Sequence, residues 1–184
     1  MTAATTLTTR RARPEDAARL GVVHVRGWQV GYLGLLPAEA LDRLDPVARA
    51  DWWARVLADQ DGAPDDGPGW TTHVAERDGE VVGFVGTGPI RGDGHTEPGS
   101  TAELFLYVHP DAWRGGVGRA LMATALDRLA CAGYADATLW VLEGNDRAIA
   151  FYEAAGWRPD GVRRVEEIWG ATATELAYRR RLAP

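Results

Sequence analysis

A strand that leads into a glycine-rich turn and then into a helix constrains this chain more than any other feature of its sequence. Residues 104–108 (LFLYV) form an apolar, aromatic-rich run of strand length, and Pro110 ends it because proline has no N–H to donate. Three glycines follow within residues 115–118, and apolar residues then recur at helical spacing over residues 117–129. The first N–H groups of such a helix lack partners within the helix. The stretch therefore predicts an anion site, and phosphate is the usual anion.

The segments around this unit predict mixed α and β structure. Expected strands cover residues 7–12, 70–77, 80–90, 103–108, 137–142 and two segments of 157–182. Expected helices cover residues 14–28, 35–44, 46–57, 117–133 and 145–155. Gly27 and Gly31 mark a break at the end of the first helix, and Asp78-Gly79 predicts a two-residue hairpin turn. This order indicates an α+β fold with one parallel crossover, and the length favours a single domain over residues 1–184.

The composition excludes several kinds of site. All 20 basic residues are arginine, so the chain has neither a Walker A phosphate loop nor a Schiff-base lysine. The single Cys131 excludes an internal disulfide and a multi-cysteine metal site; we expect a packed, inert thiol and no bound metal. A formal net charge of −6 argues against nucleic acid as a partner, and no apolar run reaches membrane-spanning length. Because the N-terminus also lacks the apolar core of a signal peptide, we expect a cytoplasmic protein.

A second motif, NDRAIAFYEAAGW at residues 145–157, begins about thirty residues after the glycine turn. Together the two motifs resemble the GNAT superfamily of acetyl-CoA-dependent N-acetyltransferases. In that family an x-x-G-x-G/A turn before a helix binds the CoA pyrophosphate. A later N-x-x-A-x-x-F/Y-Y-x-x-x-G-F/W helix contacts pantetheine and places a tyrosine near the thiol. The residues that match are Gly116 and Gly118 in the first motif, and Asn145, Ala148, Phe151, Tyr152, Gly156 and Trp157 in the second.

The resemblance covers nearly the whole chain, because the order of the expected elements also agrees with the family. It implies the GNAT fold, a mixed, mostly antiparallel central sheet of about six or seven strands with a splayed central parallel pair, flanked by helices in three layers. A dinucleotide-binding fold is disfavoured, because Leu121 stands where its third glycine would be. One position departs from the family pattern: Trp113 stands where the family usually has Gln or Arg. Arg114 is the candidate to supply the missing cationic contact.

By the same resemblance, the chain binds acetyl-CoA along the central strand, the glycine turn and the second motif. The residues assigned to this cosubstrate are Leu106, Tyr107, Val108, Arg114, Gly115, Gly116, Val117, Gly118, Arg119, Asn145 and Tyr152. Backbone groups of the strand would hydrogen-bond the pantetheine arm as an added strand does. One N–H, from either Leu106 or Tyr107, would polarise the thioester carbonyl and stabilise the oxyanion.

The chemistry also needs two proton transfers. Tyr152 is the family's candidate for the acid that protonates the departing thiolate, and the alternative for this residue is a packed aromatic ring. Glu103 is the candidate for the base that deprotonates the amine, and its alternative is a solvated carboxylate at the start of a strand. Alternation puts Glu103 on the same strand face as Phe105 and Tyr107. His24 competes less well as a base, because a packed histidine is the commoner case.

Acceptor specificity is expected between the first strand and the hairpin, where Trp28 and Tyr32 lie four residues apart. One of them would line the acceptor pocket and the other would be core, and the sequence leaves the choice open. The predicted function is transfer of acetyl from acetyl-CoA to a primary amine of a small molecule or peptide, by direct attack in a ternary complex. The alternative is a non-catalytic acyl-CoA-binding or regulatory domain of the same fold. A homodimer is compatible with the sequence.

Overall fold

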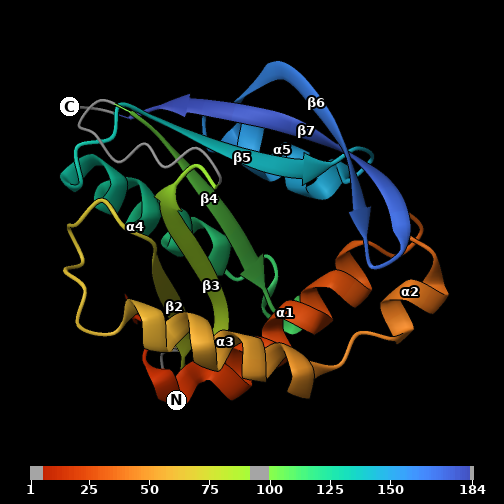
Figure 1. Ribbon diagram of the computed structural model, residues 1–184, viewed down its shortest axis with the longest axis horizontal. Coiled ribbons are helices and arrows are strands. Elements are labelled where there is room, and N and C mark those ends of the chain that lie inside the picture. Colours follow the sequence, from red (N-terminus) through yellow and green to blue (C-terminus); the bar gives the residue numbers. More distant parts are fainter. Residues whose placement is uncertain (1–5, 92–99, 183–184) are drawn as a thin grey trace, which may run out of the picture.

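The computed structural model describes residues 6–91 and 100–182, which form one seven-stranded sheet with helices on both faces (Figure 1). The strands are β1 (Leu7–Arg11), β2 (Thr71–Arg77), β3 (Glu80–Pro89), β4 (Thr101–Val108), β5 (Asp136–Leu142), β6 (Arg158–Ile168) and β7 (Ala171–Arg181). The α-helices are α1 (Ala17–Gly31), α2 (Ala38–Asp42), α3 (Pro46–Gln60), α4 (Val117–Cys131) and α5 (Asp146–Ala154), and the 3-10 helices are η1 (Pro14–Asp16) and η2 (Pro110–Ala112). None of the described helices is long and apolar enough to cross a membrane.

The strand order in the sheet is β1-β2-β3-β4-β5-β7-β6. Every neighbouring pair is antiparallel except β4–β5. Because α4 connects those two parallel strands, the strand–turn–helix unit seen in the sequence makes the one crossover of the fold. The predicted mixed, mostly antiparallel architecture is thereby confirmed. The expected loop at residues 91–100 lies almost entirely outside the described residues.

The parallel pair β4–β5 is short. Its paired residues run only from Thr101↔Asp136 to Glu103↔Thr138, although both strands continue beyond that point. On its other side β4 stays paired with β3 from Ala102 to Val108. The two parallel strands therefore separate after Glu103, as expected for a splayed pair, and a gap opens in the middle of the sheet (Figure 1).

Alternation along β4 divides its side chains between two cores. Leu104 packs with Trp157 in the core shared with α4 and α5. Phe105 and Tyr107 pack against the core that α1 and α3 form with the sheet, around the fully buried Trp53. Figure 1 shows α3 crossing in front of β2 and β3. The gap can therefore be approached from two sides: the side of α4 and α5, and the side of α1 and α3.

Two local expectations are wrong. The helix α1 continues through Gly27 to Gly31 without a break. Burial of residues such as Val23 and Val25 along α1 outweighs the roughly 1 kcal/mol cost of a glycine in a helix. Cys131 is exposed instead of packed, because it ends α4 two positions after the buried Leu129. Residues two apart on a helix face different sides.

Candidate active site

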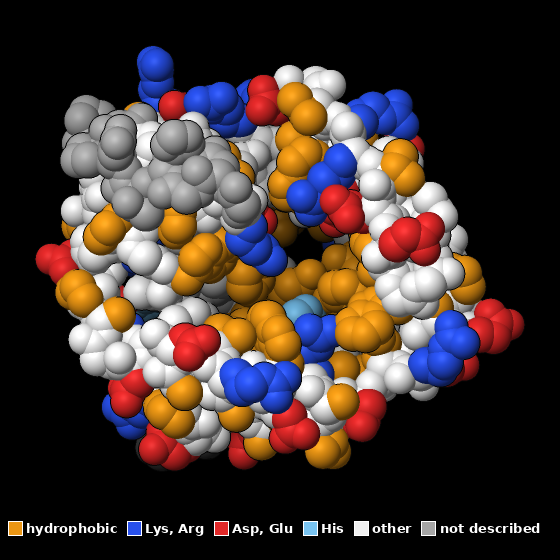
Figure 2. All heavy atoms as spheres, viewed as in Figure 1, with side chains coloured by type: hydrophobic (Ala, Val, Ile, Leu, Met, Phe, Trp, Pro, Cys, Tyr) orange, Lys and Arg blue, Asp and Glu red, His pale blue; other side chains and the backbone are white. Residues whose placement is uncertain are grey.

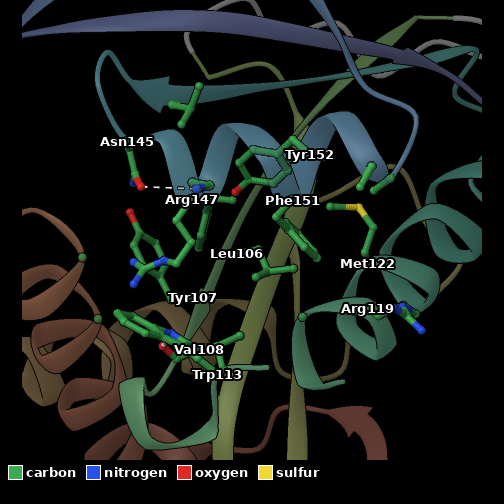
Figure 3. A pocket seen from close by; sticks show the side chains of 18 of the residues that line it. Leu106, Tyr107, Val108, Trp113, Arg119, Met122, Asn145, Arg147, Phe151 and Tyr152 are labelled. Atoms are coloured by element: carbon green, nitrogen blue, oxygen red, sulfur yellow. Dashed lines mark hydrogen bonds between the residues drawn. The ribbon is translucent and has the colours of Figure 1, made fainter. Parts of the chain in front are cut away.

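A cavity of about 690 Å³ occupies the gap between β4 and β5. Its walls are the second half of β4, the glycine turn, the start of α4, the helix α5 and the end of α1. Of the predicted site residues, those that line it are Tyr32, Leu106, Tyr107, Val108, Arg114, Gly116, Gly118, Arg119, Asn145 and Tyr152. Those that do not line it are Trp28, Glu103, Gly115 and Val117. Figure 3 shows Leu106 on β4 facing the same space as Phe151 and Tyr152 on α5.

The backbone of β4 presents hydrogen-bonding groups to this cavity. The His109 N–H donates to the Val82 carbonyl of β3 at 2.8 Å, and the register of β3 with β4 has no shift. Hydrogen-bonded and non-bonded pairs alternate in such an antiparallel ladder. Tyr107, two residues before His109, therefore directs its N–H and C=O towards β3, whereas Leu106 directs both groups into the gap. This register favours Leu106 over Tyr107 as the N–H donor to a thioester.

Trp113, the one departure from the family pattern, makes two contacts at the end of the gap. Its indole Nε1 donates to the Val108 carbonyl at 2.9 Å, which satisfies one backbone group that faces the gap. The guanidinium carbon of Arg147, on α5, lies 3.3 Å from the centroid of the indole ring. Burial lowers the pKa of Arg147, and the nearby Arg114 lowers it further. Arg147 was not predicted from the sequence, although it lies in the second motif, because the family pattern leaves its position variable.

The glycine turn has the geometry of an anion site. Arg114 and Gly116 adopt positive φ angles of 61° and 81°, and α4 then begins at Val117 without a side-chain cap. The first N–H groups of α4 therefore have no partner within the helix, and the positive end of its dipole faces the same direction. A Cβ on Gly118 would come within 3.2 Å of the Phe151 ring, so this glycine lets α4 and α5 approach each other beside the cavity.

The second motif forms the cap and the cavity-facing side of α5. Asn145 Oδ1 accepts a hydrogen bond from the Ala148 N–H at 3.3 Å and so caps the helix. Tyr152 is 7% exposed, and its side chain lies beside the cavity (Figure 3). Burial raises the pKa of Tyr152, and the neighbouring Tyr107 raises it further. The phenol is therefore protonated at neutral pH and is available as a proton donor.

Aromatic rings wall the approach from α1 and α3. The ring centroid of Trp28 lies 5.2 Å from that of Tyr32 and 6.3 Å from that of Tyr107. Both tyrosines line the cavity, and burial raises the pKa of each. Trp169, in the turn between β6 and β7, lies 6.0 Å from Trp28 and was not predicted as a site residue. Trp28 therefore connects the cavity-lining tyrosines to the β6–β7 turn.

His24 is packed within this aromatic group. The Trp53 Nε1 donates to its Nδ1 at 3.3 Å, which leaves the ring proton on Nε2. Its ring lies 4.5 Å from that of Tyr107. Burial lowers the pKa of His24 well below its usual value, and the charge of Arg49 lowers it further. The imidazole is therefore neutral, and its one basic nitrogen, Nδ1, already accepts the hydrogen bond from Trp53, so it is not free to act as a base.

Two carboxylates on this side are held in ion pairs. Glu103 Oε1 accepts from Arg91 Nη2 at 2.8 Å, and its Oε2 accepts from the Arg91 N–H at 3.2 Å. The guanidinium of Arg91 also lies over the Phe105 ring at 5.1 Å, which places Glu103 on the predicted face of β4. Glu175 on β7 pairs with Arg164 at 2.7 Å. Burial of Tyr107 is the largest cause of its raised pKa, and the negative charge of Glu175 raises it further.

The surface over these residues is hollowed. Figure 2 shows a depression near the centre of this face, with hydrophobic side chains inside it and basic side chains at its rim. The basic side chains are arginines, because the chain has no lysine. An amine could enter here and meet a thioester held along β4.

Comparison with known proteins gives one family by sequence. The model of the acetyltransferase (GNAT) family matches residues 35–157. YuaI, an uncharacterised N-acetyltransferase of Bacillus subtilis, is 32% identical over 150 residues, which are 80% of this chain and 78% of that protein. A mycothiol acetyltransferase of Streptomyces avermitilis is 37% identical over 84 residues, which are 46% of this chain and 26% of that protein.

Solved structures show the same fold. The PaiA N-acetyltransferase of Thermoplasma acidophilum, solved with coenzyme A, has a TM-score of 0.73 at 18% identity and covers 96% of this chain and 99% of its own. The ribosomal-protein-alanine N-acetyltransferase of Brucella melitensis has a TM-score of 0.70 at 23% identity and covers 95% of this chain and 99% of its own. At these identities the likeness establishes the fold.

Proposed function

This chain belongs to the acetyltransferase (GNAT) family, and on that basis we propose that it transfers an acetyl group from acetyl-CoA to a primary amine of a small molecule or peptide. The observation that supports this most is the separation of β4 from β5 after Glu103. It leaves the backbone of Leu106 without a partner strand, at a cavity that the glycine turn also lines.

The residues of the cavity fit acetyl-CoA, which supplies an activated acetyl group as its thioester. The N–H groups of the turn and of the first residues of α4, from Arg114 to Arg119, suit a pyrophosphate. Both backbone groups of Leu106 and the N–H of Val108 suit an amide-containing arm laid alongside β4, because each backbone group that faces the gap needs a partner. Trp113, Arg114 and Arg147 border the same space; in this proposal Arg114 supplies the cationic contact that the family pattern has at position 113, and Arg147 adds a second cation beside it.

Two groups of the chain act on the thioester in this proposal. The Leu106 N–H donates to the carbonyl oxygen, where a preorganised donor of this kind is typically worth about 3 kcal/mol. Tyr152 donates its phenolic proton to the sulfur as the C–S bond breaks and the amine nitrogen forms its bond to the acyl carbon. Burial keeps the proton on Tyr152 at neutral pH, but its raised pKa also makes it a weaker acid than a free phenol, so the proton moves only as negative charge develops on the sulfur beside it.

Glu103 stays our proposed base, acting through water from the acceptor face of β4. Both of its carboxylate oxygens accept hydrogen bonds from Arg91. The described residues that line the cavity include no carboxylate and no histidine, so a proton on the amine has to leave through the hollow in that face. Glu103 lies on β4, which borders the cavity, and the charge of Glu175 acts on the cavity-lining Tyr107, so substitution of each tests which of them is the base.

Release of CoA thiol in the presence of amines tests the proposed activity. The expected result is release that requires both acetyl-CoA and an amine and that matches the amount of acetylated product. The non-catalytic alternative predicts binding of acetyl-CoA with no release across a broad panel of amines. Initial velocities at varied concentrations of both substrates should give intersecting lines, as direct attack in a ternary complex requires. Substitution of the exposed Cys131 by Ala should leave these velocities and their intersecting pattern unchanged.

The remaining assignments stay predictions from the sequence. They are the cytoplasmic location, the lack of nucleic-acid and membrane partners, and the extent of the single domain. The dimeric state is left open. The proposal itself needs one chain, because all residues assigned to acetyl transfer lie in this one.

A further inference from the structure

An arginine of α3 lies beside the aromatic wall of the acceptor approach. The guanidinium carbon of Arg49 is 4.9 Å from the ring centroid of Trp169 and 5.3 Å from that of Trp52. Trp169 in turn lies beside Trp28, and Trp28 lies beside Tyr32 and Tyr107, which both line the cavity. The charge of Arg49 also reaches His24, whose ring packs on Tyr107. Two rings, Trp169 and Trp28, therefore connect Arg49 to the tyrosines that line the cavity.

Arg49 differs from Arg91 and Arg164, two other arginines that lie over aromatic rings, in having no anionic partner among the described residues. Arg91, over Phe105, pairs with Glu103 at 2.8 Å, and Arg164, over Trp140, pairs with Glu175 at 2.7 Å. In the described part of the chain, no carboxylate oxygen lies within ion-pair distance of Arg49. Carboxylates of the protein thus neutralise Arg91 and Arg164, whereas the charge of Arg49 is available to an anionic ligand.

The position of Arg49 is unfavourable for a cation that serves only stability. It lies in the first turn of α3, where the helix dipole disfavours positive charge, and its backbone N–H bonds to the carbonyl of Asp45, the N-cap. It is half-buried, and burial lowers its pKa, which means that the surroundings do not compensate its charge. An anion bound at this point would relieve both costs.

We propose that the acceptor is a small amino acid with an apolar or aromatic side chain, whose carboxylate pairs with Arg49 while its amine faces the thioester. This inference rests on the proposed acetyl transfer and specifies its acceptor. The guanidinium offers the carboxylate two parallel N–H donors, and the rings of Trp28, Trp169 and Tyr107 offer apolar contact to the side chain. An amino acid is a zwitterion with no net charge near pH 7, so the protein's net negative charge does not oppose its binding.

Pairs of amines that differ only in the carboxylate test this proposal. L-Phenylalanine with 2-phenylethylamine, L-leucine with 3-methylbutylamine, and L-valine with 2-methylpropylamine cover aromatic and apolar side chains of different size. In at least one pair, thiol release with the wild-type protein should show a kcat/KM roughly ten- to one-hundred-fold higher for the carboxylate member, the range expected for a hydrogen bond to a charged group. Arg49→Gln should remove this difference while leaving kcat/KM for the neutral member within about twofold, and Arg49→Lys should retain part of it.

Arg55→Gln is the matched control, because Arg55 is an exposed arginine of the same helix and the change removes the same charge. It should keep the wild-type preference. Equal rates for both members of every pair, an equal loss for both members in Arg49→Gln, or the same effect in Arg55→Gln would each overturn the proposal and leave acetyl transfer intact.

A binding measurement keeps the two proposals separable if no amine is turned over. N-acetyl-L-phenylalanine, the expected product, should quench tryptophan fluorescence in the wild-type protein, because Trp169 and Trp52 lie on either side of Arg49. The quenching should weaken at least about tenfold in apparent Kd in Arg49→Gln and should be absent with the neutral N-(2-phenylethyl)acetamide. Quenching that is equal for the two compounds would reject the carboxylate site whatever the fate of the acetyl-transfer proposal.

Discussion

Burial sets the protonation states of the side chains around the gap. It raises the pKa of Tyr152 and of the two tyrosines across the cavity, and it lowers the pKa of His24. These groups are therefore all neutral near pH 7: the tyrosines keep their protons, and the imidazole takes none. A carboxylate is then the proton acceptor that we propose on the amine side, and the two candidates, Glu103 and Glu175, are each paired with an arginine.

The first prediction concerns Tyr152. Tyr152→Phe removes the phenolic proton and keeps the ring, so we expect kcat to fall roughly 10²- to 10⁴-fold, the usual contribution of a general acid. The Kd for acetyl-CoA, measured by titration calorimetry, should change less than about threefold, because Leu106 and the glycine turn make the binding contacts in our proposal. An unchanged kcat would remove Tyr152 from the mechanism and leave it a packed ring.

The second prediction separates the two carboxylates. Glu103→Gln and Glu175→Gln each break one ion pair with an arginine on the acceptor side, so they impose a similar structural change. If Glu103 is the base, only its substitution should lower kcat/KM at pH 7 by more than about tenfold, and the loss should shrink as pH approaches the pKa of the acceptor amine. Equal losses in the two variants, independent of pH, would contradict the role of Glu103.

At the scale of secondary structure, the glycine turn joins a strand that lacks a partner to a helix that lacks a cap. Gly116 has a φ of 81° and open space around its Cβ position, with only Leu7 Cδ2 at 3.9 Å. Glycine is therefore required at position 116 by the left-handed backbone conformation, and not by a lack of space for a side chain. Gly118 is required for the opposite reason, since the Phe151 ring would meet its Cβ.

The third prediction uses a matched pair of glycines. Gly34 has the same φ of 81° as Gly116 and no atom within 4 Å of its Cβ position. Gly116→Ala and Gly34→Ala should therefore each lose about 1–2 kcal/mol of unfolding free energy, measured by urea denaturation, from left-handed strain. Only Gly116→Ala should weaken acetyl-CoA binding, by at least about tenfold, because it distorts the N–H groups of the turn. Similar affinities in both variants would show that the turn does not hold the phosphates.

The elements at the site were predictable because their signals are local. The run from Leu104 to Gly118 and the motif from Asn145 to Trp157 each contain a strand end, a turn or a cap within a few residues. The start of α4 at Val117 agrees with the sequence for that reason. Gly27 was misread because tertiary packing of α1 overrides the local cost of a glycine.

The rest of the site depends on contacts between distant segments. The gap exists because β4 and β5 stop pairing after Glu103, and the choice between Leu106 and Tyr107 follows from the register of β4 with β3. Neither is encoded in a single segment. Arg49 and Trp169 come from a helix and a hairpin turn that meet only in the folded chain. Pattern reading along the sequence therefore found the acetyl-CoA side of the site more completely than the acceptor side.

At the scale of the whole molecule, the neutral histidine links stability to pH. The pKa of His24 in the folded chain is far below its unfolded value of 6.5, so below about pH 6.5 the unfolded chain binds a proton at His24 and the folded chain does not. The stability that depends on neutral His24 is therefore complete above pH 6.5 and is lost as pH falls from 6.5 towards the folded pKa.

The fourth prediction follows from this linkage. The unfolding free energy should fall between pH 7 and pH 5 by up to about 1.4 kcal/mol per pH unit from His24 alone. His24→Gln keeps an acceptor for the Trp53 indole N–H and has nothing to titrate, so its slope should be shallower. His109→Gln is the control, since His109 is nearer the surface, at the start of η2, and should change the slope less. A wild-type slope in His24→Gln would mean that His24 does not titrate as its burial requires.

Amide hydrogen exchange read residue by residue by NMR tests the central claim most directly. In the protein alone, the Leu106 N–H should exchange faster than the Tyr107 N–H, because Leu106 faces the gap and Tyr107 bonds to β3. Addition of acetyl-CoA should protect the N–H groups of Leu106 and of the turn from Arg114 to Arg119, and should leave Tyr107 and the distant strand β6 unchanged. Protection of Leu106 before acetyl-CoA is added, or protection that appears only elsewhere, would contradict the proposal that the gap between β4 and β5 holds the thioester.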